Sequence, residues 1–248
     1  MQHLIFFEPV TWGMIFNGTV IGSGFDTVPG GNAYVNKSVY SFHYYCWWYY
    51  DTGMNIETCD HILLPKVFDE VLRTVKQIGG AAMLTEWGQG CDYDHGNPNN
   101  ATSECSAIMD IADKYYLGWT DWYFSEHLAD LGKNWALTEN AQKIFSRTFA
   151  HAVAGTPEHA HFDVETKEFK LCFKPNSSSS SSSSDTDTAS ITEIFARMDL
   201  HYPNGIEVSS TPNLELIKID TDNNRVFFRN RAKVPDVLGQ ACITLTPK

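Results

Sequence analysis

The stretch that decides the fold is Leu64–Gly88, LPKVFDEVLRTVKQIGGAAMLTEWG. Apolar side chains recur at helical spacing from Leu64 to Ile78, which predicts an amphipathic helix that ends at Gly79-Gly80. The apolar run Ala81–Thr85 then predicts a buried strand, with Glu86 at its end. A helix followed by a near-continuous apolar strand is the repeat unit of an α/β protein with a parallel sheet.

Similar units lie on both sides of this stretch. The expected strands are His3–Phe7, Val39–His43, Ala81–Glu86 and Tyr116–Trp119. Beyond the helix at 64–78, a second helix is expected around Ser103–Tyr115, and a third begins at a Thr138 cap and carries Ile144, Phe145, Phe149 and Val153. Four strand–helix units therefore fill a first domain at residues 1–155.

The pattern changes after Gly155-Thr156-Pro157, where apolar and polar residues begin to alternate as they do in antiparallel strands. The alternating segments are His161–Val164, Glu168–Phe173, Leu214–Ile219 and Arg225–Phe228. They predict a small antiparallel β-sandwich at residues 156–248. The eight-serine run Ser177–Ser184 predicts a disordered loop at 176–190 inside it, with no function assigned.

Charge excludes some classes of partner. The chain has 18 Lys and Arg against 30 Asp and Glu, a net charge of −12 over 248 residues. A non-specific nucleic-acid binder needs a basic surface, so that class is excluded, and attachment to anionic membranes is disfavoured. No apolar run reaches the roughly 18 residues of a membrane span, and no transmembrane segment is expected.

The cysteines and the glycosylation sequons indicate a compartment. Six cysteines fall in neighbouring pairs, for which we expect the disulfides Cys46–Cys59, Cys91–Cys105 and Cys172–Cys242. Four Asn-x-Ser/Thr sequons begin at Asn17, Asn36, Asn100 and Asn176. Together they favour a secreted or lysosomal glycoprotein, and the alternative is a cytosolic protein with buried free thiols. Because no signal peptide is visible after Met1, the true N-terminus is expected to lie further upstream. No cysteine or histidine spacing indicates a metal site, and no cofactor is expected.

Chemically useful side chains follow each predicted strand of the first domain. In chain order these are Glu8, His43 with Tyr45, Glu86, and Trp119 with Trp122. The carboxyl ends of parallel strands meet at one edge, where α/β-barrel enzymes place their working residues. A single such carboxylate could be a core ion-pair residue, but the set is harder to explain as packing.

Glu86 is the main catalytic candidate. It emerges from an apolar strand, and His43 and Tyr45 are the donors expected to keep it ionised. An ionised, partly desolvated glutamate can attack an anomeric carbon and form a glycosyl ester. Aromatic clusters suit a sugar partner, since ring faces stack on pyranoses, and Trp47, Trp119 and Trp122 are the substrate-binding candidates.

At these residues the sequence resembles the endoglycoceramidase branch of glycoside hydrolase family 5. The resemblance rests on Ile5–Trp12, Gly24-Phe25 with Val28–Gly31, Ser41–Tyr45 and Leu84–Gly88, and more weakly on Tyr202–Gly205. It implies a (β/α)8 barrel followed by a β-sandwich, and cleavage of the bond between oligosaccharide and ceramide in glycosphingolipids. It also implies that Glu86 is the nucleophile of a retaining mechanism, that His43 and Tyr45 surround it, and that Trp122 or Trp119 supports the sugar.

The sequence departs from this family at the second carboxylate. The family pairs a strand-seven nucleophile with an acid/base in an Asn-Glu-Pro on strand four, about 5–5.5 Å apart in retaining enzymes. Glu8-Pro9 lacks the Asn, and only one predicted strand lies between Glu8 and Glu86. We therefore interpret Glu8 as a structural or supporting residue at the end of strand five. The expectation is a C-terminal half barrel, with the acid/base upstream of Met1 and no turnover by this chain alone.

Other readings stay open. Another family 5 β-glycosidase, glucosylceramidase-like or acting on oligosaccharides, would use the same nucleophile. A non-catalytic protein that binds glycans or glycolipids would use the same aromatic residues. A purely structural sandwich protein explains the last part of the chain but not the residues at the strand ends.

Overall fold

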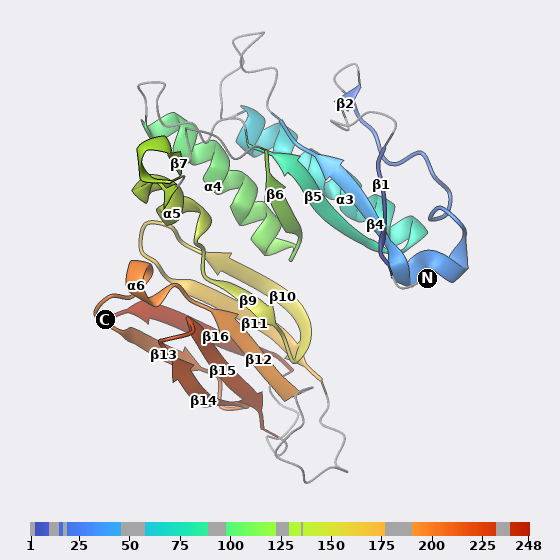
Figure 1. Ribbon diagram of the computed structural model, residues 1–248. Coiled ribbons are helices and arrows are strands. Elements are labelled where there is room, and N and C mark those ends of the chain that lie inside the picture. The colour runs from blue at the N-terminus through green and yellow to red at the C-terminus, as the bar shows by residue number, and fades with distance from the viewer. Residues whose placement is uncertain are drawn as a thin grey trace. The chain divides into compact units, whose positions relative to one another are not determined.

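The computed structural model describes residues 3–9, 15–16, 19–45, 58–88, 98–122, 129–134, 136–176, 190–231 and 239–248. The chain forms two compact units (Figure 1). The first consists of Met1–Ala112 and Leu117–Leu137, and the second of Asp113–Tyr116 and Thr138–Lys248.

The first unit alternates strands and helices. Its strands are β1 (Ile5–Phe7), β2 (Ile15–Phe16), β3 (Thr19–Val20), β4 (Ser38–His43), β5 (Ala81–Trp87), β6 (Gly118–Asp121), β7 (Ala129–Asp130) and β8 (Ala136–Leu137). Its helical segments are η1 (Asn32–Lys37), the π-helical turn η2 (Cys59–Leu63), α3 (Leu64–Ile78), α4 (Pro98–Lys114) and η3 (Leu131–Lys133).

The main sheet of this unit is parallel throughout, in the order β1-β4-β5-β6. All four predicted strands are therefore present, in the predicted orientation. The predicted helix at 64–78 is α3, which buries Val67, Phe68 and Val71 completely. Phe68 packs edge-on against Phe42 of β4, with ring centroids 5.3 Å apart. Gly79 ends the helix at a φ of +83°, a conformation that favours glycine.

Strand β6 starts two residues later than predicted. After α4, Tyr116 adopts a left-handed φ of +55°, its N–H donates to the Asp113 carbonyl, and the Leu117 N–H donates to the Ala112 carbonyl. These two bonds form a Schellman motif, so Tyr116 and Leu117 end the helix and do not belong to the strand. The strand therefore begins at Gly118 and reaches Asp121.

The second unit is built mostly of antiparallel strands. They are β9 (Phe149–Ala152), β10 (Gly155–Phe162), β11 (Phe169–Pro175), β12 (Ile191–Phe195), β13 (Ile206–Ser210), β14 (Leu214–Asp220), β15 (Arg225–Asn230) and β16 (Ala241–Pro247). Its helices within the described residues are α5 (Glu139–Phe145) and α6 (Met198–His201), together with the last residues of α4.

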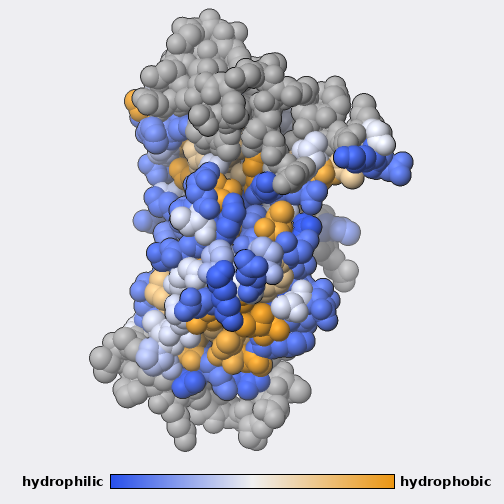
Figure 2. Space-filling view, turned by 90° about the vertical axis from the view of Figure 1, so that its left-hand side faces the viewer, coloured by the Kyte–Doolittle hydropathy of each residue, from blue (hydrophilic) through white to orange (hydrophobic). Residues whose placement is uncertain are grey.

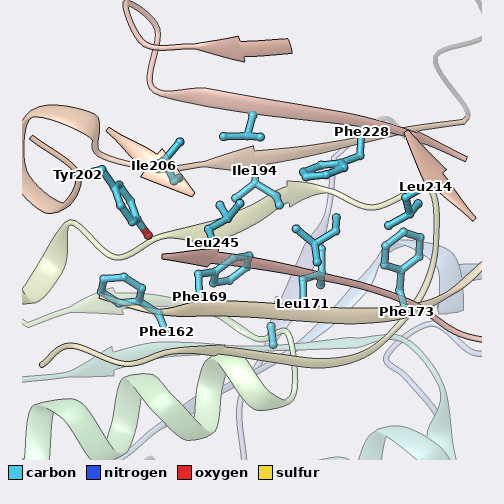
Figure 3. Close-up of a cluster of buried hydrophobic side chains, with 14 of the residues drawn as sticks. Phe162, Phe169, Leu171, Phe173, Ile194, Tyr202, Ile206, Leu214, Phe228 and Leu245 are labelled. Carbon is cyan, nitrogen blue, oxygen red and sulfur yellow. The ribbon is translucent and has the colours of Figure 1, made fainter. Parts of the chain in front are cut away.

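These strands form two four-stranded sheets, ordered β10-β11-β16-β13 and β14-β15-β12-β9. Their inward-facing side chains share one apolar core that includes Phe162, Phe169, Phe173, Ile194 and Phe228 (Figure 3). The alternating burial along β11, β12 and β15 is the period-two pattern of a strand with one buried face. The expected antiparallel sandwich is thus present, with the predicted hairpin β14–β15 within it.

The helix that begins at the Thr138 cap is shorter than predicted. The Thr138 hydroxyl accepts a hydrogen bond from the Ala141 N–H, as a helix cap should, but the helix ends at Phe145. Phe149 and Val153 do not belong to it, because Phe149–Ala152 is strand β9 and pairs with β12. This strand precedes the expected domain boundary at residue 155, and the second unit takes in the chain from Thr138 onward.

Of the three expected disulfides, Cys172–Cys242 is confirmed. Cys172 and Cys242 form a disulfide across neighbouring strands β11 and β16, with Cα atoms 4.2 Å apart. Cys59 and Cys105 are also disulfide-bonded. Their expected partners, Cys46 and Cys91, lie outside the described residues, as does most of the serine-rich loop at 176–190.

The edge strand β14 exposes three apolar side chains, Leu216, Ile217 and Ile219, each at 36 to 42%. On the face drawn in Figure 2, hydrophilic residues predominate, and hydrophobic surface gathers in the lower part of the view. None of the helices in the described part of the chain has the length and hydrophobicity needed to cross a membrane.

Candidate active site

The candidate site lies at the carboxyl edge of the parallel sheet. Because β1, β4, β5 and β6 run in the same direction, the residues at or just beyond their ends meet at that edge. These residues are Glu8 after β1, His43 and Tyr45 at and after β4, Glu86 near the end of β5, and Asp121 with Trp122 at and after β6.

Glu86 is held by Tyr45 and faces His43. The Tyr45 hydroxyl donates a 2.7 Å hydrogen bond to Glu86 Oε1, and His43 Nδ1 lies 3.8 Å from the same oxygen. Burial, the hydrogen bond to Glu86 and the negative charges of Glu86 and Asp121 all raise the pKa of Tyr45 far above its ordinary value. Tyr45 is therefore a permanent hydrogen-bond donor to Glu86 at physiological pH. The structure thus brings together the predicted nucleophile and both of its predicted donors.

A break in the strand register aims Glu86 at His43. On the β4 side, Phe42 pairs with Leu84, but the next pair is His43 with Glu86, so β5 contains one residue more than β4 at Thr85. On the other side, the register of β5 against β6 is also interrupted between Leu84 and Trp87. An extra residue of this kind redirects the side chains that follow it, and such bulges are common beside active sites. Without it, Thr85 would lie opposite His43.

Glu8 lies on the other side of the His43 ring. His43 Nε2 is 3.4 Å from Glu8 Oε1, and the Ser41 hydroxyl donates a 3.0 Å hydrogen bond to the same oxygen. Ser41 also shares a 2.5 Å hydrogen bond with the Thr85 hydroxyl. Two carboxylates thus flank one imidazole, and the Ser41–Thr85 contact links Glu8 to the bulge below Glu86. The sequence analysis did not single out Ser41 and Thr85, although both lie in the quoted strand-end motifs.

The two tryptophans expected to support a sugar differ in exposure. Trp119 lies within β6 and packs edge-on against the fully buried Trp87, with ring centroids 5.3 Å apart. Trp122, immediately after β6, is 58% exposed, and its backbone N–H donates to the Trp87 carbonyl at 2.5 Å. Of the two, Trp122 therefore presents the more accessible indole face. The third candidate, Trp47, lies outside the described residues.

Asp121 is a residue that the sequence analysis missed. Burial raises the pKa of its carboxyl from 3.8 to about 6, and its charge is one of those that act on Tyr45. Its Oδ1 atom is buried and has no hydrogen-bond partner among the residues that the structure describes. It lies so close to Gly88 that a Cβ there would come within 2.6 Å of it. The available signal was its place at the end of a predicted strand, between the two tryptophans.

The described side chains offer no metal site. Among them, no group of three or more His, Cys, Asp or Glu residues is arranged to hold a metal ion.

A carboxylate held by a tyrosine at the carboxyl edge of a parallel sheet, with an exposed indole after the neighbouring strand, fits an α/β enzyme that acts on carbohydrates. Sequence profiles give the family. Residues 1–127 match Cellulase (glycosyl hydrolase family 5), and residues 147–238 match the glycoside hydrolase family 5 C-terminal domain. The chain belongs to glycoside hydrolase family 5.

Curated relatives are similar over most of this chain. An endoglycoceramidase of Hydra vulgaris is 29% identical over 234 residues, which cover 92% of this chain and 38% of the relative. An endoglycoceramidase of Cyanea nozakii is 32% identical over 222 residues, covering 85% of this chain and 38% of that protein. The chain thus spans less than half the length of these relatives.

Solved structures share the fold. Endo-glycoceramidase II from Rhodococcus sp., solved as a lactosyl-enzyme intermediate, aligns with a TM-score of 0.65 at 17% identity, over 99% of this chain and 49% of that one. The same enzyme in complex with ganglioside GM3 aligns with a TM-score of 0.64. A sterylglucosidase from Cryptococcus neoformans aligns with a TM-score of 0.59 at 13% identity, over 85% of this chain and 39% of that structure. The chain therefore has the fold of one part of these larger proteins.

Proposed function

We propose that the chain carries the nucleophile half of a retaining glycosidase that cleaves the linkage between oligosaccharide and ceramide in glycosphingolipids. The observation that carries this proposal is the Tyr45–Glu86 hydrogen bond of 2.7 Å at the carboxyl edge of the sheet. The family membership and the endoglycoceramidase relatives support it. The lactosyl-enzyme intermediate of the Rhodococcus enzyme supports the covalent mechanism.

In this mechanism Glu86 attacks the anomeric carbon of the sugar that is linked to ceramide. The bond from that carbon to the ceramide oxygen breaks, an acid protonates the departing oxygen, and a glycosyl ester forms on Glu86. Tyr45 orients the carboxylate through a hydrogen bond that it keeps, because its raised pKa leaves the phenol protonated. Trp122 supplies an exposed indole on which the sugar ring stacks. Water then hydrolyses the ester.

The acid/base is proposed to come from a part of the protein outside this chain. Retaining hydrolysis needs a second carboxylate across the sugar from the nucleophile. Glu8 does not suit that role, because the His43 ring lies between the two carboxylates, with Nε2 3.4 Å from Glu8 Oε1 and Nδ1 3.8 Å from Glu86 Oε1. Glu8 instead supports His43. The parallel sheet of β1, β4, β5 and β6 is then the C-terminal half of a (β/α)8 barrel, and this fits the 38% of the relatives that the chain spans.

The half-barrel proposal is tested by sequencing the transcript upstream of Met1. We expect an open reading frame that encodes further strand–helix units and an Asn-Glu-Pro segment. An in-frame stop directly before Met1, with no such segment encoded, would contradict the proposal.

The activity is tested with the full-length protein on two substrates, a ganglioside and a soluble aryl β-glycoside. We expect release of the intact oligosaccharide from the ganglioside, and loss of that release in the variant Glu86→Gln. Turnover of the aryl glycoside alone would favour another family 5 β-glycosidase. Full activity in Glu86→Gln would exclude the proposed nucleophile. The 248-residue chain alone is expected to show no turnover of either substrate.

A second candidate function is binding of glycans without catalysis. The 58% exposure of Trp122 beside a polar strand edge favours it for the chain taken alone. Saturable ganglioside binding that Trp122→Ala weakens, without turnover by the full-length protein, would favour this function over the enzyme.

A further inference from the structure

We infer that Asn36 carries an N-linked glycan, attached before the chain folds, at the end of the parallel sheet opposite Glu86. The inference rests on three independent observations: the exposure of Asn36, the burial of Ser38, and the oxidised state of the cysteines. It does not depend on the proposed catalytic function.

Asn36 is suited to carry a bulky, hydrated group. It lies in η1 and is exposed, in the sequon Asn36-Lys37-Ser38. A sugar on its amide therefore projects into solvent without displacing core atoms.

The burial of Ser38 indicates that the glycan is attached before the chain folds. This third residue of the sequon begins β4, is 2% exposed, and donates its hydroxyl to the Tyr34 carbonyl at 2.9 Å. A transferase must reach the asparagine amide and the serine hydroxyl together, and the fold buries the hydroxyl. Transfer must therefore precede the pairing of β4 with β1 and β5.

The cysteines independently indicate the compartment in which such transfer occurs. Cys59, Cys105, Cys172 and Cys242 are disulfide-bonded, and no cysteine in the described ranges is a free thiol. Disulfides of this kind form and persist in the secretory pathway and are rare in the cytosol. The same lumen holds the glycan donor, a lipid-linked oligosaccharyl pyrophosphate.

The transfer itself is a substitution at the first sugar carbon of that donor. The amide nitrogen of Asn36 forms a bond to this carbon, the bond from the carbon to the pyrophosphate oxygen breaks, and the amide nitrogen gives up one proton. The lipid pyrophosphate leaves with the bonding electron pair. No oxidant or reductant is required.

The position of Asn36 keeps the glycan away from the candidate active site. Asn36 precedes the first residue of β4, Ser38, whereas His43 ends the strand. At about 3.3 Å per residue, the strand holds these two ends roughly 17 Å apart. The glycan thus covers the amino edge of the sheet and leaves the carboxyl edge, with Glu86, accessible.

The other three sequons are only partly described by the structure. Asn17 lies outside the described residues, and the side chain of Asn100, in the first turn of α4, is not described. Asn176 is exposed after β11, but its sequon continues into the undescribed serine run. These three serve as internal controls, since modification at any of them shows that the transferase acted on the chain.

The test is translation of the 248-residue chain behind a cleavable signal peptide in the presence of microsomes. Glycans are then released enzymatically in H₂¹⁸O, and the peptide that contains residue 36 is analysed by mass spectrometry. We expect conversion of Asn36 to ¹⁸O-labelled aspartate, with one glycan fewer in Asn36→Gln. Ser38→Thr, which keeps the sequon, and Asn32→Gln, an exposed asparagine of the same turn without a sequon, should both keep the glycan.

Two results would overturn the inference. One is an unmodified Asn36 peptide from chains that are glycosylated at another sequon. The other is a chain protected inside microsomes that carries no glycan at all. When the folded, unglycosylated chain is instead mixed with detergent-solubilised oligosaccharyltransferase and its lipid-linked donor, we expect no modification of Asn36, whereas the reduced and unfolded chain should be modified. Efficient modification of the folded chain would contradict the argument from the burial of Ser38.

Discussion

Replacing Asp121 with asparagine is expected to remove a pH-dependent cost from the stability of the first unit. Burial raises the pKa of this carboxyl from 3.8 to about 6. The unfolded chain therefore loses the proton first as pH rises, while the folded protein holds it up to about pH 6. The favourable contribution of the protonated group is complete below about pH 3.8 and is lost as pH rises to about 6. The asparagine side chain would carry no charge at any pH.

The pKa shift of Asp121 limits how much unfolding free energy the substitution can recover. A difference of about two pKa units corresponds to at most about 3 kcal/mol of unfolding free energy, at 1.36 kcal/mol per unit. Relative to the parent protein, Asp121→Asn should gain up to this amount between pH 4 and pH 7.5. Partial solvation of the carboxyl reduces the figure, so a gain of about 1–3 kcal/mol is expected.

Tryptophan fluorescence reports on the right unit, because all seven tryptophans lie at or before residue 135 and Thr138–Lys248 contains none. Urea unfolding is followed by this signal at pH 4 and pH 7.5 for the parent, Asp121→Asn and the control Asp69→Asn. Asp69 is an exposed carboxylate on α3 of the same unit. An equal change in unfolding free energy between pH 4 and pH 7.5 in all three proteins would refute the claim that burial of Asp121 lowers stability.

Three further predictions concern single contacts. In the full-length protein, Tyr45→Phe should lower kcat roughly 10- to 100-fold, because it removes a hydrogen bond to a charged group worth about 1.5–3 kcal/mol; unchanged kcat would contradict the role of Tyr45. Arg147→Met should cost about 3–5 kcal/mol in urea unfolding followed by circular dichroism, because the 3% exposed guanidinium binds Asp113 at 2.9 Å; the exposed pair Arg197–Asp199 is the control, and Arg197→Met should cost under about 1 kcal/mol. Replacing Cys172 and Cys242 by serine opens a loop with a sequence separation of 70 and should cost about 4 kcal/mol; no fall in the melting temperature would contradict this estimate.

The sequence predicts the elements of the fold better than their ends. The helix at 64–78 and the strands around it follow from apolar periodicity, which responds directly to burial. The start of β6 was misplaced by two residues because Tyr116 and Leu117 end α4, with a tyrosine rather than a glycine in the left-handed conformation. The last helix was extended too far because Phe149 and Val153 continue its helical spacing, although tertiary pairing with β12 makes Phe149–Ala152 a strand.

The candidate site could be predicted in its residues but not in its geometry. Glu86, His43 and Tyr45 follow from their places at strand ends, since parallel strands bring those ends together. The pairing of Glu86 with His43 depends on the extra residue at Thr85, and no local pattern in Leu84–Gly88 predicts a bulge. Asp121 was missed because its raised pKa is caused by burial, which only the folded backbone determines.

The most direct test of the account is covalent trapping of the nucleophile. The full-length protein is incubated with a 2-deoxy-2-fluoro-β-glycoside that carries a good leaving group, since the fluorine slows hydrolysis of the glycosyl ester. Peptide mass spectrometry is then used to locate the sugar. The account predicts a single ester on Glu86, absent in Glu86→Gln. A label on Glu8 or Asp121, with Glu86 unmodified, would contradict it.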